Sequence, residues 1–330
     1  MSKQKNSIDA IVLLAKQSGI SSFSSLWQIK NALNMKKIGH TGTLDTFAEG
    51  LLVALSGRLT RLVPYITNCF KTYIAEITFG SETDTLDPDG SIISEKPLPI
   101  FSNILSILPA FSGEIDQIPP LYSALHVAGQ RASDRVRKGE IIELSSRKIE
   151  IFSLKIISAK TKKGIHPSNE SLVSSIIIEV TCSKGTYIRS LARDIAIASG
   201  SCAHLSALRR TAIGPFNLEK AAGTHLLASF ASVPPKQYGV GDRPPLVPAG
   251  EIIEGILPFT PQISTQIGLF PITISENKKR SFLTGVALET DWFTGPFFEK
   301  NSVFSEDVFL GVVQNAALRP SYEFVAGDGL

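Results

Sequence analysis

The sequence predicts an α+β fold followed by a small β-rich C-terminal domain. Residues 71–80 (KTYIAEITFG) alternate apolar and polar side chains, which is typical of a half-buried strand. Residues 24–33 instead repeat their apolar side chains at the spacing of one helix face. Near the C-terminus, the short alternating runs 308–313 and 322–326 lie between Gly and Asn turns. Strands and helices therefore mix over most of the chain, and strands dominate its end.

The other elements follow from the same patterns. We expect strands over 8–14 and 51–56, and helices near 104–111 and over 131–138. Residues 174–200 combine a strand, a Lys-Gly turn and a helix that buries Leu191, Ile195 and Ala198. The adjacent prolines of QIPPLYSAL (117–125) forbid a helix there. Residues 38–50 and 81–90 are too rich in Gly, Thr and Asp for regular structure, so we expect loops.

Composition favours an ordinary globular protein with a basic body. The 330 residues are 43% hydrophobic and 19% charged, with a net charge of +3. Residues 1–265 carry 28 basic and 22 acidic side chains, whereas residues 266–330 carry 5 and 8. The body could thus attract a polyanion, and we expect a domain boundary at 265/266. Five prolines in residues 231–248 indicate a stiff insertion or linker.

The chain shows the features expected of a cytoplasmic protein. Its three cysteines are odd in number and form no CxxC pair, which favours a reducing compartment. No apolar run approaches the roughly 18 residues of a membrane span, and no signal peptide is apparent. We expect no membrane association, and a monomer, because no symmetric apolar patch is legible.

Local sequence alone leaves the candidate site residues open. Asp45 in a Gly-Thr loop is also typical of an Asx turn, and His40 of an ordinary loop histidine. Tyr73 could simply pack in the core, and Arg209 with Arg210 could be a solvated pair. Phosphate-loop, HExxH and GxSxG motifs are all missing.

Arg189 is harder to explain as a surface residue. It stands where a strand-turn-helix pattern places the positive end of a helix, so a carboxylate or a phosphate would be needed beside it. A side chain turned to solvent remains the alternative.

Five collinear segments carry a resemblance to a known family. They are IGHTGTLDTFAEGLLVALSGRLTRL (38–62), KTYIAEITFGSETDTLDPDG (71–90), GEIDQIPPLYSALHVAGQRASDRVRKG (113–139), CSKGTYIRSLARDIA (182–196) and HLSALRRTAIG (204–214). The chain resembles the TruB family of tRNA pseudouridine synthases. The resemblance implies a central mixed, largely antiparallel sheet flanked by helices, plus a PUA-like C-terminal domain over residues 266–330. It also implies that uridine 55 in the T-loop of tRNA is the substrate, and that neither a cofactor nor a metal is needed.

The resemblance assigns roles by position. Asp45 matches the catalytic aspartate and Arg189 the arginine that pairs with it. Tyr73 matches a tyrosine that stacks on the uracil and that is also considered for removing the proton at C5. His40 is expected to fill the space left by the extruded base, while Tyr187 and Leu208 close the pocket. Extruding the base costs roughly a few kcal/mol, and stacking offsets it.

RNA phosphates should meet basic side chains. The candidates are Lys16, which matches a family lysine, together with Arg131, Arg135, Arg137, Lys138, Arg209 and Arg210. The chain departs from the family at AKQSGISS (15–22), where DKPxGxTS is usual, at Thr46 in place of Pro, and at Glu49.

Two other function classes remain as alternatives. One is a catalytically weak tRNA-binding or RNA-folding module that uses the same cleft. The other is a carboxylate-dependent hydrolase, in which Asp45 and Glu49 would be the two acids, about 5–10 Å apart.

Overall fold

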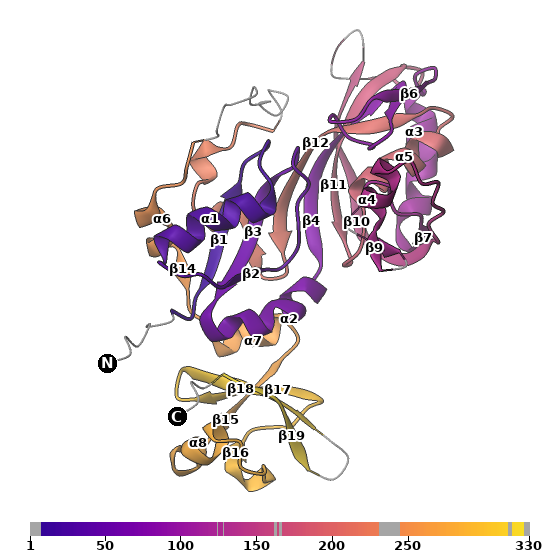
Figure 1. Cartoon of the computed structure of the whole chain (residues 1–330). Helices are drawn as coiled ribbons and strands as arrows, with labels where there is room; N and C mark the ends of the chain where they lie inside the picture. Colours follow the sequence, from indigo (N-terminus) through magenta and orange to yellow (C-terminus); the bar gives the residue numbers. More distant parts are fainter. Residues whose placement is uncertain are drawn as a thin grey trace.

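A computed structural model describes residues 8–123, 125–127, 129–161, 164, 167–230, 245–315 and 319–326. Its centre is a ten-stranded sheet in which eight strands run in the order β14-β1-β3-β12-β4-β11-β10-β7 (Figure 1). The remaining two strands extend it, β2 beside β3 and β13 beside β12. All neighbours are antiparallel except β3 and β12. The expected mixed, largely antiparallel sheet is therefore confirmed.

The strands of this sheet span β1 (Ile11–Lys16), β2 (Ile38–His40), β3 (Glu49–Ser56), β4 (Lys71–Phe79), β7 (Gly113–Gln117), β10 (Arg147–Thr161), β11 (Val173–Cys182), β12 (Ala203–Ile213), β13 (Phe216–Asn217) and β14 (Ile256–Leu257). Two small hairpins lie outside it, β5 (Ser81–Thr83) with β6 (Ile92–Glu95), and β8 (His126–Val127) with β9 (Gln130–Arg131). β4 buries every second residue, as its alternation predicts, whereas β1 is buried throughout.

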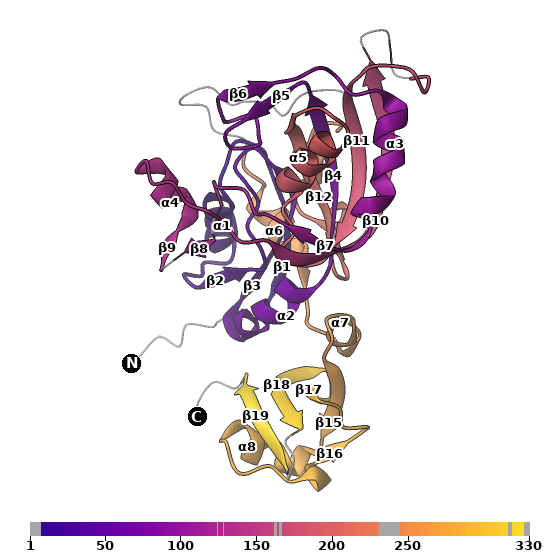
Figure 2. The same ribbon diagram turned by 90° about the vertical axis from the view of Figure 1, so that its right-hand side faces the viewer.

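Two groups of helices cover separate halves of the sheet (Figures 1 and 2). α1 (Ser22–Ala32) and α6 (Ala249–Glu254) pack against β1 and β3, around Leu26, Ile29 and Ile252. α3 (Phe101–Ile107) and α5 (Ile188–Ala198) pack against β4, β11 and β12. α2 (Val63–Asn68) follows a 3₁₀ turn after β3, and α4 (Ala132–Arg137) follows the β8–β9 hairpin. The halves meet at the parallel pair β3–β12.

Gly50 makes the junction of the two halves possible. It has φ +106°, and a Cβ atom there would lie 2.4 Å from the carbonyl oxygen of Arg210 on β12. Only glycine adopts this conformation without strain and allows so close an approach. The end of the motif loop 38–50 is therefore fixed against β12.

A second, five-stranded sheet forms the β-rich C-terminal region, as expected. It consists of β15 (Phe270–Ile274), β16 (Phe293–Thr294), β17 (Lys300–Ser305), β18 (Val308–Asn315) and β19 (Pro320–Val325), in the order β16-β15-β17-β18-β19, with α8 (Glu276–Leu283) packed on it. α7 (Pro261–Gln266) leads into it, so the expected boundary at 265/266 falls at the end of a helix.

The two sheets share one apolar cluster. In Figure 1 the C-terminal sheet lies below α2 and α7. Phe304 and Phe309 of the C-terminal sheet pack in the same cluster as Leu59, Leu62 and Ile66. Arg61 adds a hydrogen bond of 2.7 Å to the carbonyl oxygen of Val325. The C-terminal sheet is thus docked on the body through buried side chains.

Some details differ from the sequence expectations. The first strand begins at Ile11, three residues later than expected, and the helix expected near 104–111 ends at Ile107 before a 3₁₀ turn. Leu191 and Ile195 are buried on α5 as expected, but Ala198 is exposed in its last turn; Ala192 and Ala196 are buried instead.

The Pro-rich stretch is only partly visible. Residues 231–244 lie outside the described residues, whereas Val247, at its end, donates its backbone N–H to Gln28 of α1 at 2.8 Å. Among the described residues, no helix has both the length and the apolar character needed to cross a membrane.

Candidate active site

A cavity of about 660 Å³ opens where the two halves of the body meet. The N-terminus of α1, the loop 41–48, β4, β12, the N-terminus of α5 and α4 all contribute to its walls. Of the expected site residues it is lined by His40, Asp45, Tyr73, Arg131, Arg137, Tyr187, Arg189 and Leu208. Residues that are up to 168 positions apart in the sequence are thereby brought together.

The loop 41–48 is held from beneath by buried polar side chains. Lys16, at the end of β1, donates from Nζ to the carbonyl oxygens of Asp45, at 3.1 Å, and of Ala48. Ser22 accepts from the N–H of Leu44 at 2.9 Å and donates to its carbonyl oxygen. Because these contacts reach the backbone, they fix where the Asp45 carboxylate points without using the carboxylate itself.

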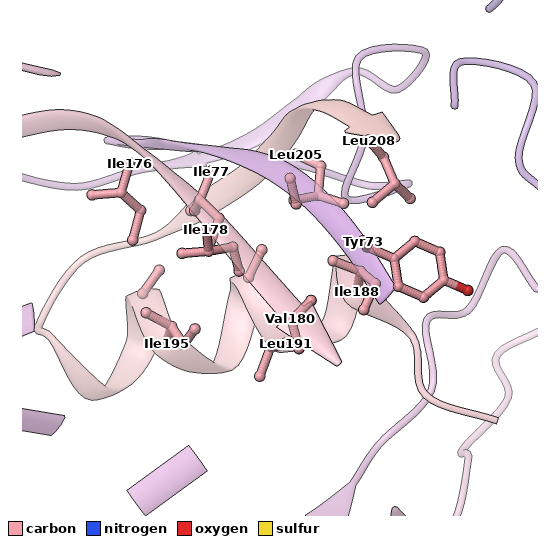
Figure 3. Packing of buried hydrophobic residues seen from close by; sticks show 14 of the residues in the cluster. Tyr73, Ile77, Ile176, Ile178, Val180, Ile188, Leu191, Ile195, Leu205 and Leu208 are labelled. Atoms are coloured by element: carbon pink, nitrogen blue, oxygen red, sulfur yellow. The ribbon is translucent and has the colours of Figure 1, made fainter. Parts of the chain in front are cut away.

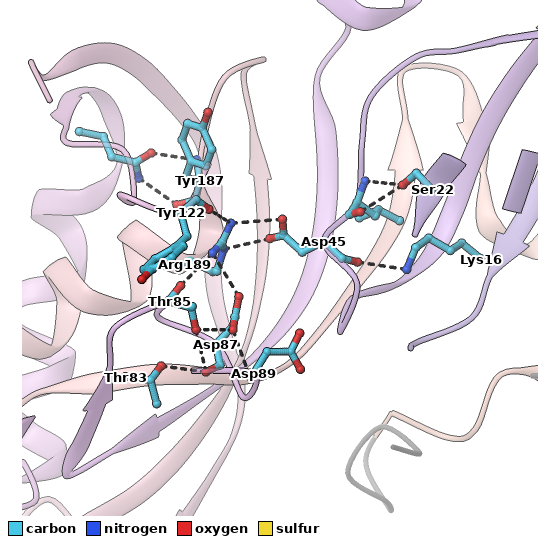
Figure 4. Close-up of polar contacts among 12 residues, drawn as sticks. Lys16, Ser22, Asp45, Thr83, Thr85, Asp87, Asp89, Tyr122, Tyr187 and Arg189 are labelled. Atoms are coloured by element: carbon cyan, nitrogen blue, oxygen red, sulfur yellow. Dashed lines mark hydrogen bonds and ion pairs between the residues drawn. The ribbon is translucent and has the colours of Figure 1, made fainter. Parts of the chain in front are cut away.

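Arg189 binds the Asp45 carboxylate with two nitrogens (Figure 4). Nε lies 2.9 Å from Oδ2, and Nη2 lies 3.2 Å from Oδ1. The arginine side chain is only 6% exposed, whereas that of Asp45 is 39% exposed. The guanidinium is therefore a fixed partner, and the carboxylate remains open to the cavity.

The guanidinium has no spare donor for solvent. Besides Asp45, it donates from Nη1 to Asp87 at 3.1 Å and to the carbonyl oxygen of Thr85 at 2.8 Å. Nη2 also donates to the carbonyl oxygen of Tyr122 at 3.0 Å. The five N–H groups of an arginine thus face five acceptor contacts, which determine its orientation.

Asp87 is a buried carboxylate that supports Arg189 from the side away from Asp45. Its Oδ1 accepts from the Thr85 hydroxyl at 2.6 Å and from the backbone N–H of Asp89 at 3.1 Å. Burial raises the pKa of Asp87, while the bond from Thr85 and the charge of Arg189 oppose that rise. Asp87 and Asp45 therefore share one cation between them.

Tyr187 caps the helix that carries Arg189. Its backbone N–H donates to Oε1 of Gln117 at 2.8 Å, and its carbonyl oxygen accepts from Nε2 at 3.1 Å. This reciprocal pair ties the N-terminus of α5 to the edge strand β7. The positive end of the helix dipole thus lies beside Asp45 and Asp87, and the two carboxylates explain the arginine that seemed misplaced in the sequence.

Tyr73 and Leu208 form an apolar wall of the cavity (Figure 3). Their strands are paired so that Tyr73 stands opposite Arg210 and Leu208 opposite Ala75, which places both side chains on one face. Burial raises the pKa of Tyr73, and the neighbouring charge of Arg210 opposes the rise. The phenol is consequently neutral near pH 7.

His40 lines the same cavity in a neutral form. Its Nδ1 accepts the backbone N–H of Gly42 at 3.3 Å, which leaves the ring proton on Nε2. Burial lowers the pKa of His40, and the charge of Arg210 adds to this shift. The imidazole can therefore act as a flat, uncharged surface beside the substrate space.

Three of the side chains expected to contact RNA are already paired within the protein. Lys16 and Arg210 are fully enclosed, and their nitrogens bind carbonyl oxygens of the motif segment; Arg210 donates to Gly42 at 3.1 Å and to Leu51 at 2.8 Å. Arg209 donates from Nε to Oε1 of Glu49 at 2.7 Å. Lys16 and Arg210 are therefore shielded from solvent, whereas the Arg209 side chain keeps 14% of its surface exposed.

The other four candidates lie on or beside α4. Arg131 and Arg137 line the cavity, and both are exposed. Arg135 is paired with Glu140 at 2.6 Å, and Lys138 is exposed at the C-cap of the helix. Arg131 and Arg137 thus place two guanidinium groups at the α4 side of the cavity.

The sequence reasoning missed Asp87 and Phe23 and left Glu49 ambiguous. Asp87 lies in residues 81–90, whose composition predicts only a loop, although its DPDG pattern belongs to the second resembling stretch. Phe23 lines the cavity from α1, with no local signal. Glu49 does not line the cavity, and its pairing with Arg209 removes the two-acid arrangement that a hydrolase would need.

Family comparisons match the same segments. Residues 30–188 match the family described as TruB family pseudouridylate synthase (N terminal domain), and residues 189–233 match a tRNA pseudouridylate synthase B C-terminal domain. The chain is 40% identical to tRNA pseudouridine synthase B of Treponema pallidum (strain Nichols) and 39% identical to that of Treponema denticola. Each alignment covers 96% of this chain and 97% of the relative.

Solved structures share the fold at lower identity. The archaeal box H/ACA sRNP Nop10-Cbf5 complex contains a chain that superposes with a TM-score of 0.63 at 20% identity. The superposition covers 97% of this chain and 86% of the other. The likeness therefore extends over both sheets.

Proposed function

Because this chain belongs to the TruB family of pseudouridylate synthases, we propose that it converts uridine 55 in the T-loop of tRNA to pseudouridine. One observation carries the proposal: the Asp45 carboxylate is open to a nucleotide-sized cavity and is bound by the buried Arg189. The names of the relatives support tRNA as the substrate. The choice of the T-loop uridine goes beyond those names and is part of the proposal.

The reaction requires a charged carboxylate next to the sugar–base junction. The N1–C1′ bond breaks, the uracil turns, C5 bonds to C1′, and the C5 proton leaves while N1 gains one. Asp45 acts as the nucleophile, because the two bonds from Arg189 orient its carboxylate toward the cavity. No atom is gained or lost, so the residues of the cavity suffice.

The cavity fits an extruded base rather than a stacked one. Tyr73 stacks on the uracil, and Leu208 with Tyr187 closes the pocket around it. Since burial raises the pKa of Tyr73, its neutral phenol is a poor base, and we assign it to stacking ahead of proton removal at C5. His40 occupies the space that the base leaves in the RNA.

The same proposal covers the remaining parts of the molecule. Phosphates of the T-arm contact the basic side chains on and beside α4, which are Arg131, Arg135, Arg137 and Lys138. The catalytic domain comprises residues 1–265, and a PUA-like domain comprises residues 266–330. The net charge of −3 in the latter gives it little attraction for RNA. The enzyme acts as a monomer in the cytoplasm.

Tritium release tests the activity directly. Unmodified tRNA labelled with 5-tritiated uridine should lose tritium when incubated with the full chain, and sequencing of the modified tRNA should place the pseudouridine at position 55. Asp45→Asn, which keeps the shape of the side chain, should abolish release while tRNA binding persists.

Two outcomes would contradict the proposal. Release at another position would keep the chemistry and overturn the T-loop assignment. Normal tRNA binding by the wild-type chain without product under single-turnover conditions would instead favour a module that only binds or folds RNA.

A further inference from the structure

α1 presents an exposed aromatic face beside the cavity. Phe23 is 73% exposed and Trp27 is 55% exposed, although most large apolar side chains of the body are buried. They are four residues apart, so they lie on one face of the helix. Leu26 and Ile29 are buried in the core instead, and Ser22 is buried against loop 41–48. Phe23 and Trp27 therefore take little part in packing α1 against the body.

A positive charge accompanies the rings. Lys30, seven residues after Phe23 and on the same face, places Nζ 5.2 Å from the centroid of the Phe23 ring. Lys36 and Lys37 are exposed just beyond the helix. An apolar protein surface would gain little from these cations, whereas a nucleotide offers both a flat base and a phosphate.

The face is continuous with the site. Phe23 lines the same cavity as Asp45, and so do Arg131 and Arg137 on the α4 side. Loop 41–48 is tied to α1 through Ser22, so the ring and the carboxylate are held by one rigid connection. The cavity thus has the Phe23 ring on its α1 side and two arginines on its α4 side, one of them paired with Asp134 at 3.6 Å.

We propose that Phe23 and Trp27 form a stacking platform for an unpaired base of the substrate RNA that neighbours the target uridine. The inference rests on the proposed function, since it requires RNA in the cavity. The base stacks on the two rings, and the adjacent phosphates contact Lys30, Lys36 and Lys37. The platform supports the RNA next to the position from which the uridine is extruded.

Ring-selective variants test the role of Phe23. Phe23→Leu keeps apolar volume but removes the ring, and should raise KM for unmodified tRNA about 5- to 100-fold with kcat near the wild-type value. Phe23→Tyr keeps the ring and should stay within about threefold of wild type. Phe152→Leu is the matched control, because Phe152 is also exposed but lies on β10 and does not line the cavity.

Fluorescence tests the platform without turnover. Trp27 and Trp292 are the two tryptophans of the chain, and Trp292 is buried. In the full-length Asp45→Asn protein, saturating unmodified T-arm RNA should protect Trp27 from acrylamide quenching. Adding Trp27→Phe to the same protein should abolish this RNA-dependent change.

The outcomes separate this inference from the proposed function. If the wild-type chain makes no pseudouridine, the proposed function fails. If it is active but Phe23→Leu leaves KM within twofold or alters only kcat, the platform is refuted. The platform is also refuted if adding RNA does not change acrylamide quenching of Trp27. It is likewise refuted if Trp27 is already protected without RNA, through contact between protein copies.

Discussion

Arg189 binds both oxygens of Asp45, and it does so from the first turn of a helix that is itself tied to β7. The arginine is buried and the aspartate is not, so the pair is asymmetric: one partner is fixed and the other faces the substrate. A carboxylate held in this way is oriented and accessible at the same time.

Arg189→Lys should lower kcat by at least about 100-fold. A lysine keeps the charge but cannot span Asp45, Asp87 and the carbonyl oxygens that now surround the guanidinium. Tritium release under single-turnover conditions measures the loss. Arg193→Lys, one turn further along α5, is the control and should leave kcat unchanged, because Arg193 contacts Asp194 and Ile118 rather than the cavity.

Asp87→Asn should lower kcat about 10- to 100-fold without a matching change in KM. The substitution removes one of the two charges that position the guanidinium, while the side chain keeps its size. Asp84→Asn is the comparison, since Asp84 accepts from the N–H of Ser91 in the same loop and does not contact Arg189. Equal effects of the two variants would indicate a loop defect instead of misplacement of Arg189.

Glu49 and Arg209 should be coupled in stability but not in turnover. Each side chain is only 14% exposed, so Glu49→Gln leaves a largely buried cation unpaired and should cost about 2–4 kcal/mol in the free energy of unfolding. Arg209→Met combined with Glu49→Gln should recover part of the loss. Urea unfolding of the four proteins gives the coupling energy, and additive effects would argue against the pair.

Lys16 should make stability rise with pH above neutrality. Burial lowers the pKa of Lys16 from 10.5 to about 7, and the Asp45 charge opposes the shift. Between these values the unfolded chain binds more protons than the folded one, so this group adds up to about 1.4 kcal/mol per pH unit as pH rises, and the gain is lost as pH falls through 7.

Lys16→Met should flatten that dependence. Urea unfolding at pH 7, 8 and 9 compares the slopes of the two proteins, which cancels the ionisation of other groups. A slope that the substitution leaves unchanged would show that Lys16 stays protonated in the folded protein.

Motifs and periodicity predicted the parts of this molecule that depend on local order. The alternation of 71–80 identified β4 and its buried face, and the position of Arg189 at a helix start indicated an anionic partner. The identity of that partner required the resemblance, because 144 residues separate Asp45 from Arg189.

Burial of charge was the part that sequence could not predict. Lys16, Arg209 and Arg210 appear as basic as Arg131 in the sequence, but carbonyl oxygens of the motif loop, and the Glu49 carboxylate, surround them in the fold. Asp87 was missed for the related reason that its role depends on Arg189 approaching from another element.

The apolar cluster that joins the two sheets has a consequence for cutting the chain. A fragment ending at residue 265 would expose Leu59, Leu62 and Ile66 to water, since Phe304 and Phe309 would be gone. Such a fragment should be prone to aggregation, although it contains every residue that lines the cavity. Heat should accordingly melt the intact chain in a single transition that includes both sheets.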